Sequence, residues 1–193
     1  MSFMHNVKIP RDRVGVLIGK KGKVKDKIEK SCGVKLEIDS EGGDVMISNA
    51  TNIEEMSPFK AVEIVTAIAK GFSPNRADRL LHEEVTLHVQ DLKEFTSKSN
   101  NALERIKGRI IGLDGKARKV MEELSGAYIS VYGHSVAMIG NSEEIRLVNE
   151  AVTMLAKGST HKSVYNILQA ARRRAKLERL KLWEDNGYES RNF

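Results

Sequence analysis

The sequence predicts an α+β fold made of two tandem copies of one unit, followed by a long basic helix. The first observation is a glycine-bracketed turn, Gly19-Lys20-Lys21-Gly22, which returns 93 residues later as Gly112-Leu113-Asp114-Gly115. The second is that residues around each turn also match at this offset. The third is a change of hydrophobic period after each turn, from helical spacing to strand alternation. Together they predict the order β-α-α-β-β-α in each copy.

The internal match extends well beyond the turns. At the offset of 93, seven residues meet identical residues in the second copy, namely Gly15, Ile18, Gly19, Gly22, Lys23, Glu29 and Gly33. A later segment, 63–71, matches 150–158 at an offset of 87, which implies a six-residue insertion or deletion between the two stretches. The chain is therefore interpreted as a tandem duplication.

In the first copy, residue chemistry sets the element boundaries. Pro10 and Pro58 suit helix starts, and Gly33 suits a helix end. After Gly33, apolar and charged residues alternate, which predicts a half-buried strand. The predicted elements are a strand over 7–9, helices over 11–18 and 23–31, strands over 34–38 and 45–48, and a helix over 57–69.

The second copy repeats this order after a break at Ser73-Pro74-Asn75. Its predicted elements are a strand over 85–89, an insertion over 96–101, helices over 102–111 and 116–125, strands over 128–132 and 135–139, and a helix over 142–156. We expect a first domain at 1–73, a linker at 74–84, a second domain at 85–158, a basic C-terminal helix at 159–185 and a frayed tail at 186–193.

The C-terminal helix has no counterpart in the first copy. Residues 161–185 contain neither Gly nor Pro, and a narrow apolar stripe runs beside a cluster of cations. Three readings stay open: a solvated helix docked on the second module, a second RNA contact, or a protein-binding surface. The cations that would serve either contact are Arg172, Arg173, Arg174 and Lys176.

Composition limits the classes of function. The 193 residues carry a net charge of +6, which permits a polyanionic partner. No apolar run approaches the ~20 residues of a membrane span, so we expect a cytoplasmic protein. Cys32 is the only cysteine, which excludes a disulfide framework and Cys-rich zinc sites. The five histidines lack metal-ligand spacing. Asp114 could bind a metal near phosphate or simply tolerate the turn geometry. We expect no enzyme activity, cofactor or metal.

The repeated order, with its G-x-x-G turn between the first two helices, is similar to the eukaryotic-type (type I) KH module, an RNA-binding fold. Residues 14–23 and 33–38 follow the KH pattern, and 110–112 with 126–131 follow it again. Two such modules followed by residues 158–168 resemble archaeal members of the small-subunit rRNA-processing KH proteins. The second turn departs from the pattern at Leu113, where a basic or small residue is usual.

The resemblance implies a single-stranded RNA-binding protein that recognises the 3′ end of small-subunit rRNA during ribosome biogenesis. About four unpaired nucleotides would lie in a groove between the glycine turn with its helices and the edge of the sheet. In eukaryotes the family that it resembles is implicated in maturing this 3′ end alongside the endonuclease that makes the final cut. Such a nuclease, or a translation initiation factor, is a candidate partner of an expected monomer. The alternatives are an adaptor that recruits one of these proteins, and an RNA-cleaving or RNA-modifying enzyme.

Phosphates would meet the glycine turns and the cations beside them. The first set is Gly19, Lys20, Lys21, Gly22 and Lys23, with Val16 and Leu36 as groove floor and Lys35 beside it. The second set is Gly112, Leu113, Gly115, Lys116 and Arg118, with Arg109 and Tyr128 as neighbours. The lysines after the first turn could instead form a solvated helix face, and Tyr128 is as much a packing candidate as a binding one.

Overall fold

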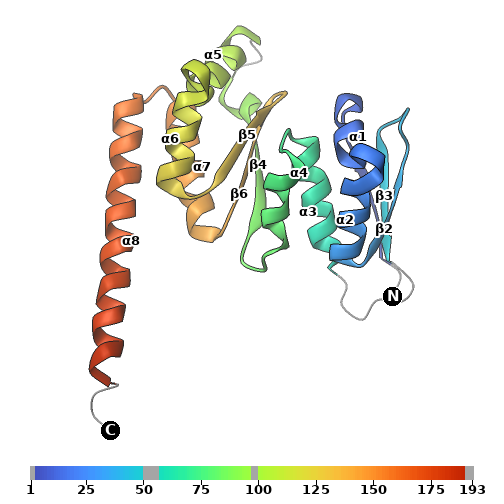
Figure 1. Ribbon diagram of the computed structural model, residues 1–193. Coiled ribbons are helices and arrows are strands. Elements are labelled where there is room, and N and C mark those ends of the chain that lie inside the picture. The colour runs from blue at the N-terminus through green and yellow to red at the C-terminus, as the bar shows by residue number, and fades with distance from the viewer. Residues whose placement is uncertain (1–2, 50–56, 97–99, 190–193) are drawn as a thin grey trace.

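The computed structural model describes residues 3–49, 57–96 and 100–189 and contains two modules with a long helix beyond them (Figure 1). The first module comprises β1 (Met4–Lys8), α1 (Arg11–Ile18), the 3₁₀ turn η1 (Lys20–Gly22), α2 (Lys23–Cys32), β2 (Val34–Ile38), β3 (Asp44–Asn49) and α3 (Pro58–Ala69). Its strands form an antiparallel sheet in the order β1-β3-β2, so β2 is an edge strand.

The second module repeats this architecture. It comprises β4 (Thr86–Asp91), the 3₁₀ turn η3 (Leu92–Phe95), α5 (Asn100–Ile111), η4 (Leu113–Gly115), α6 (Lys116–Ser125), β5 (Tyr128–Tyr132), β6 (Ser135–Gly140) and α7 (Ser142–Ala156). The antiparallel sheet order is β4-β6-β5, which leaves β5 at the edge. The predicted α+β fold with two β-α-α-β-β-α units is confirmed.

The helix ends follow from residue chemistry. Pro58 occupies the first turn of α3, where its missing N–H costs nothing. Gly33, with a φ of 65°, ends α2 in the left-handed conformation. Asn141 and Glu144 form a reciprocal capping box at the start of α7, with both hydrogen bonds at 2.9 Å.

The second sheet is covered on both faces. Strand β6 is buried along its whole length, and its alternate residues enter two different cores. Val136 and Met138 pack under α5, α6 and α7, whereas Ala137 and Ile139 join the hydrophobic core of the first module. In the first sheet, Met46 on the outer face of β3 remains 39% exposed. The two modules therefore share a hydrophobic core and are not independently packed domains.

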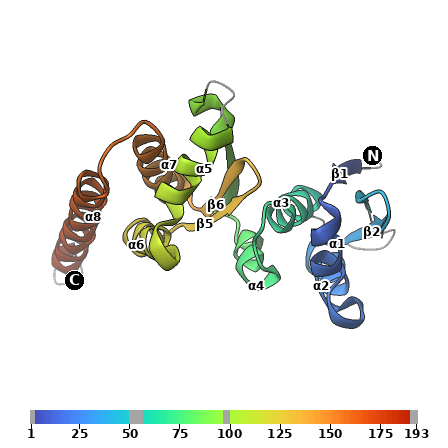
Figure 2. The ribbon, with the colours of Figure 1, turned by 90° about the horizontal axis from the view of Figure 1, so that it is seen from above.

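The connection between the modules is part of that packing. Helix α4 (Pro74–Ala77) and the 3₁₀ turn η2 (Asp78–Leu81) lie between the two modules in both views (Figures 1 and 2). Ala77 and Leu80 are fully buried in the first core. The stretch expected as a linker is thus a packed element that fixes one module against the other.

Helix α8 (His161–Glu189) begins on the second module and then leaves it (Figure 1). Val164 and Leu168 are buried in the second core, but Leu177 and Leu180 are 60% and 52% exposed. The helix continues four residues past its predicted end at 185. None of the helices in the described ranges is both long and apolar enough to cross a membrane.

Other boundaries also differ from prediction by a few residues; for example, β4 spans Thr86–Asp91 instead of 85–89, and α5 begins at Asn100, inside the predicted insertion. Strand β1 begins at Met4 instead of residue 7, because it pairs with β3 as far as Ser48. The predicted insertion over 96–101 is preceded by η3, and residues 97–99 lie outside the described part. Of the expected frayed tail, 190–193 also lies outside it.

Candidate nucleic-acid interface

The two glycine turns have nearly the same backbone geometry. The first glycine of each turn, Gly19 or Gly112, has φ and ψ of 73° and 175° or 71° and 176°. The last, Gly22 or Gly115, is left-handed, with φ of 76° or 74°. This agreement extends the sequence repeat to the conformation of the backbone, so both turns can present their amides in the same way.

The third position of each turn is conformationally strained. Lys21 and Asp114 have φ of 55° and 51°, and they are the only non-glycine residues with positive φ in the described part of the chain. Left-handed backbone is unfavourable for residues with a Cβ and concentrates at functional sites. The strain marks both turns as sites where the backbone conformation itself matters.

The first glycine of each turn is also required by packing. A Cβ at Gly19 would lie 2.4 Å from Cγ2 of Val24, and one at Gly112 would lie 2.6 Å from Cβ of Ala117. These contacts press the turn against the helix that follows it. Each glycine therefore fixes where the turn lies on its module.

The side chains that the turns present differ in charge. Lys20, Lys21 and Lys23 are exposed and make no ion pair with any residue that the structure describes. The second turn instead exposes Leu113, at 83%, and Asp114. The first turn is a cationic tip, whereas the second depends on its backbone and on cations farther along α6.

A glutamate joins the second helix of each turn to the edge strand. Glu29 accepts the Leu36 N–H at 2.7 Å, and Glu122 accepts the Ile129 N–H at the same distance. Each carboxylate also meets a cation, Lys25 at 3.9 Å from Glu29 and Arg76 beside Glu122. The pairs α2–β2 and α6–β5 thus form equivalent strips that lead away from the turns.

A glycine lies inside the helix that precedes each turn. Gly15 of α1 and Gly108 of α5 have no neighbouring atom within 4 Å of the place where a Cβ would be. Glycine weakens a helix interior by about 1 kcal/mol relative to alanine, and internal packing does not require it here. An external group can therefore come close to the helix backbone at both positions.

Comparison with known proteins matches both modules. Residues 86–173 match a family model described as a eukaryotic-type KH domain (type I), and residues 4–65 match a KH domain. A KH domain-containing protein of Methanocaldococcus jannaschii is 44% identical over 191 residues, covering 96% of this chain and 84% of the relative. The chain belongs to the tandem KH-domain proteins.

Within these proteins, the match extends to the Dim2p and PNO1 relatives. The crystal structure of an a/eIF2α–aDim2p–rRNA complex from Pyrococcus horikoshii contains a chain with 46% identity and a TM-score of 0.84, covering 89% of this chain and 95% of that one. The pre-rRNA-processing protein pno1 of Schizosaccharomyces pombe is 30% identical over 118 residues, 61% of this chain. The KH chain aligns with about half of that eukaryotic relative, at 49% of its length.

The first KH module corrects two predicted contacts. Leu36 is fully buried, so its side chain belongs to the core and is not an exposed groove floor. Lys35 lies on the opposite face of β2 by strand alternation and pairs with Glu37 at 2.8 Å. That exposed ion pair raises the pKa of Lys35 and lowers that of Glu37. Val16 is half-buried against the first core.

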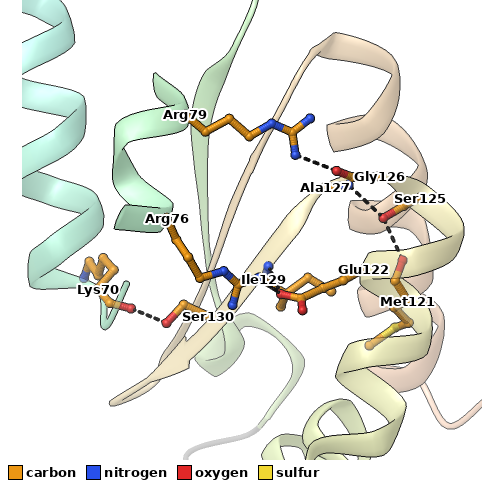
Figure 3. Close-up of polar contacts among 10 residues, drawn as sticks. All are labelled: Lys70, Arg76, Arg79, Met121, Glu122, Ser125, Gly126, Ala127, Ile129 and Ser130. Carbon is orange, nitrogen blue, oxygen red and sulfur yellow. Dashed lines mark hydrogen bonds and ion pairs between the residues drawn. The ribbon is translucent and has the colours of Figure 1, made fainter. Parts of the chain in front are cut away.

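In the second KH module, Tyr128 lies against the connection. The guanidinium groups of Arg76 and Arg79 lie 4.4 and 5.0 Å from its ring centroid. Figure 3 shows Arg76 reaching Glu122 and Arg79 reaching the Gly126 carbonyl, the latter at 2.5 Å. Tyr128 is thus an inter-module packing residue, which corrects the predicted RNA contact.

Arg109 has a structural role. Its guanidinium donates to the Leu155 carbonyl at 3.1 Å and to the Ser159 carbonyl, so it caps the end of α7. The Arg109 carbonyl in turn lies 2.8 Å from Nε2 of His161 at the start of α8. Arg109 was predicted as an RNA-binding neighbour of the second turn, and its guanidinium is instead engaged by backbone carbonyls at the end of α7.

The predicted cations on α8 are all exposed. Arg172 and Lys176 also line a cleft of about 670 Å³ between α8 and the ends of α6 and α7, whose opposite wall carries Glu123 and Glu143. Arg173 and Arg174 are also exposed. The first part of α8 is thus docked on the second module. For the rest of the helix, a second RNA contact and a protein-binding surface both stay open.

Sequence reasoning did not assign Lys25, Gly15 or Gly108 to the candidate site. Lys25 corresponds to the assigned Arg118 at the offset of 93, so the repeat itself was the signal that could have found it. Among the described residues, no group of three or more His, Cys, Asp or Glu could hold a metal ion. Burial raises the pKa of Cys32 to about 11, so its thiol is a poor nucleophile.

Proposed function

We propose that this protein binds single-stranded RNA at the 3′ end of small-subunit rRNA and acts as a ribosome-biogenesis factor in rRNA processing, without cutting the RNA. The observation that carries the proposal is the pair of glycine turns with matching strained backbones, each followed by a strip toward an edge strand. The rRNA in the aDim2p complex and the pre-rRNA-processing role named for the yeast relative support the target.

In the first module, the RNA backbone meets the cationic tip. Lys20, Lys21 and Lys23 supply positive charge that no carboxylate of the described chain neutralises, while the turn supplies backbone N–H groups. The strand then follows the strip along α2, where Gly15 gives a base access to the helix backbone. Lys25 and Glu29 form an ion pair within that strip.

In the second module, binding depends less on the tip. Leu113 and Asp114 cannot attract phosphate, so the amides of the turn, Lys116 and the half-buried Arg118 take that role. Gly108 again opens the helix face to a base. The second module therefore contributes fewer counterion-releasing contacts than the first, and its share of the affinity is less dependent on salt.

The protein partner is proposed on narrower grounds. The aDim2p complex contains a/eIF2α, which supports an adaptor role toward a translation initiation factor alongside RNA binding. A processing endonuclease is the other candidate, since a factor that holds an rRNA end must present it to the enzyme that cuts it. We expect the protein to act as a monomer in the cytoplasm.

Three RNAs test the proposal at one salt concentration: a strand with the 3′-terminal small-subunit rRNA sequence, a scrambled strand of the same composition, and a duplex. The terminal strand should bind on the order of tenfold or more tighter than either other RNA, because only an unpaired strand can offer its bases to the strips. Equal affinity for all three would contradict the proposal. Cleavage of the strand by pure protein with Mg²⁺ would instead assign an enzymatic role.

A further inference from the structure

A small recess lies between α2, α3 and the connecting helix α4. Its volume is about 170 Å³, and its floor includes Ile28, Ile64 and Ile68, which are at most 3% exposed. Its polar rim includes Lys23 and Asn75. By helical periodicity, the α2 residues of the recess lie on the side of that helix opposite Lys25 and Glu29, so the recess is distinct from the strip toward β2.

The recess lies on the path between the two KH modules. In both views α4 lies between α6 and α2, the helices that follow the two glycine turns (Figures 1 and 2). Side-chain contacts fix this order: Arg76 of α4 pairs with Glu122 of α6, and Asp78 pairs with Lys27 of α2 at 2.5 Å. Lys23, at the rim, directly follows the first turn. A strand held by both modules that ran directly from α2 to α6 would cross α4 beside this recess.

The chemistry of the recess suits one nucleobase. Its volume equals that of roughly five or six water molecules, which is the size of a single planar ring. The isoleucine floor removes the ring from water, while unpaired Lys23 can meet the adjoining phosphate. Lys27 neutralises Asp78, whose carboxylate still has lone pairs for a second donor. That acceptor favours a base with an exocyclic amino group.

We propose that the recess binds one unpaired base of the RNA strand between the segments held by the two modules, and that it prefers a base with an exocyclic amino group. This rests on the proposed RNA-binding function. The connecting helix would then be a third site of contact with the RNA. The bound base would fix the number of nucleotides between the two held segments.

An abasic scan of the rRNA 3′-terminal strand tests the proposal in the full chain. One abasic position outside the two held segments should lower affinity about tenfold. Two variants identify the held segments: Lys20→Asp with Lys21→Asp for the first module, and Lys116→Asp for the second. An abasic site within a held segment should lose its effect on affinity in the variant of the module that holds that segment. If every position outside them is neutral while the strand still binds, the recess is not a base site and the proposed function stands. No binding by the wild-type chain would overturn both.

Two variants assign the sensitive position to the recess. Asn75 is exposed at the rim, so Asn75→Trp can cover the recess with little effect on the fold, and Asn75→Ala is its matched control. Asn75→Trp should lower the affinity for intact RNA to the wild-type affinity for the abasic strand, and the two RNAs should then bind this variant equally. Asn75→Ala should still bind intact RNA more tightly than the abasic strand. Asp78→Asn should remove a several-fold preference for cytosine over uracil there. An abasic effect that is unchanged in Asn75→Trp would refute the assignment.

Discussion

The Tyr132 hydroxyl donates to both carboxylate oxygens of Asp12, at 2.7 and 2.9 Å, and so joins the edge strand of the second module to the first helix of the first. A second contact lies nearby, where the Ser130 hydroxyl donates to the Lys70 carbonyl at 2.8 Å (Figure 3). Residues more than fifty positions apart in the sequence thus fix the angle between the modules.

Removing the Tyr132 hydroxyl should loosen this junction. Tyr132→Phe is expected to lower the free energy of unfolding by about 1 kcal/mol, because one charge-assisted hydrogen bond is lost from a partly exposed site. Chemical denaturation measures the change. Tyr165→Phe is the matched control, since the Tyr165 hydroxyl forms no hydrogen bond within the described chain. Equal stability of wild type and Tyr132→Phe would show that the contact contributes nothing.

The same hydrogen bond predicts that the protein loses stability at alkaline pH. Its hydrogen bond to Asp12 raises the pKa of Tyr132 above the usual value of 10.0. Because the folded state favours the protonated phenol, the contribution is fully present below pH 10 and is lost as pH rises through the raised pKa. A stability profile between pH 8 and 11 should fall more in wild type than in Tyr132→Phe; parallel curves would contradict this.

Charge reversal at the first turn separates binding from folding. Lys20→Asp with Lys21→Asp should reduce affinity for the rRNA 3′-terminal strand by on the order of tenfold or more and make the salt dependence shallower by about two phosphate contacts. The fold should persist, because Asp114 already occupies the position equivalent to Lys21 with the same left-handed backbone. Binding by fluorescence anisotropy at several salt concentrations gives both quantities.

The control for this variant must carry the same change in charge. Lys93→Asp with Lys157→Asp alters two exposed lysines that belong to neither turn. If the two double variants lose affinity equally, the effect is one of net charge, and the first turn has no specific role.

Substitution of the two helix glycines should change stability and RNA binding in opposite directions. Gly15→Ala and Gly108→Ala are each expected to raise the free energy of unfolding by about 1 kcal/mol, since both sites are helical and have room for a methyl group. Each should nevertheless weaken RNA binding, about tenfold, because the methyl group lies where a base comes close. The larger loss identifies the module with the greater share of the affinity. A more stable variant with unchanged affinity would show that no base uses that site.

Arg109→Ala should have the opposite signature. The loss of two hydrogen bonds to the end of α7 is expected to cost about 1–3 kcal/mol of stability. RNA affinity should change less than about twofold at a temperature where both proteins are folded. Arg105→Ala, an exposed cation on the same helix, is the control. A large loss of affinity with unchanged stability would restore Arg109 to the binding surface.

Sequence reasoning recovered the local features of the fold because they depend on local chemistry. The glycine turns, the proline helix starts and the alternation in β2 each follow from a few neighbouring residues. One misassignment depends on contacts between the modules. Tyr128 and Lys35 are equivalent in the repeat, yet only Tyr128 is covered, because the connection passes over the second sheet and leaves the first exposed.

The predicted site shows the same division. Lys20 and Lys21 could be placed at an exposed turn because two glycines bracket them. Arg109 could not be separated from them, since its carbonyl partners lie some fifty residues further along the chain. Leu36 was assigned to a surface although its alternation with Lys35 and Glu37 already indicated a buried side chain.

The shared use of β6 also orders events during synthesis. Helix α3 leaves the ribosome before β6 does, so the first copy is available as the surface on which Ala137 and Ile139 can settle. Without it, one face of the second sheet would remain open to association with other chains. The first module can therefore assist the folding of the second, whereas the second module depends on the first to cover one face of its sheet.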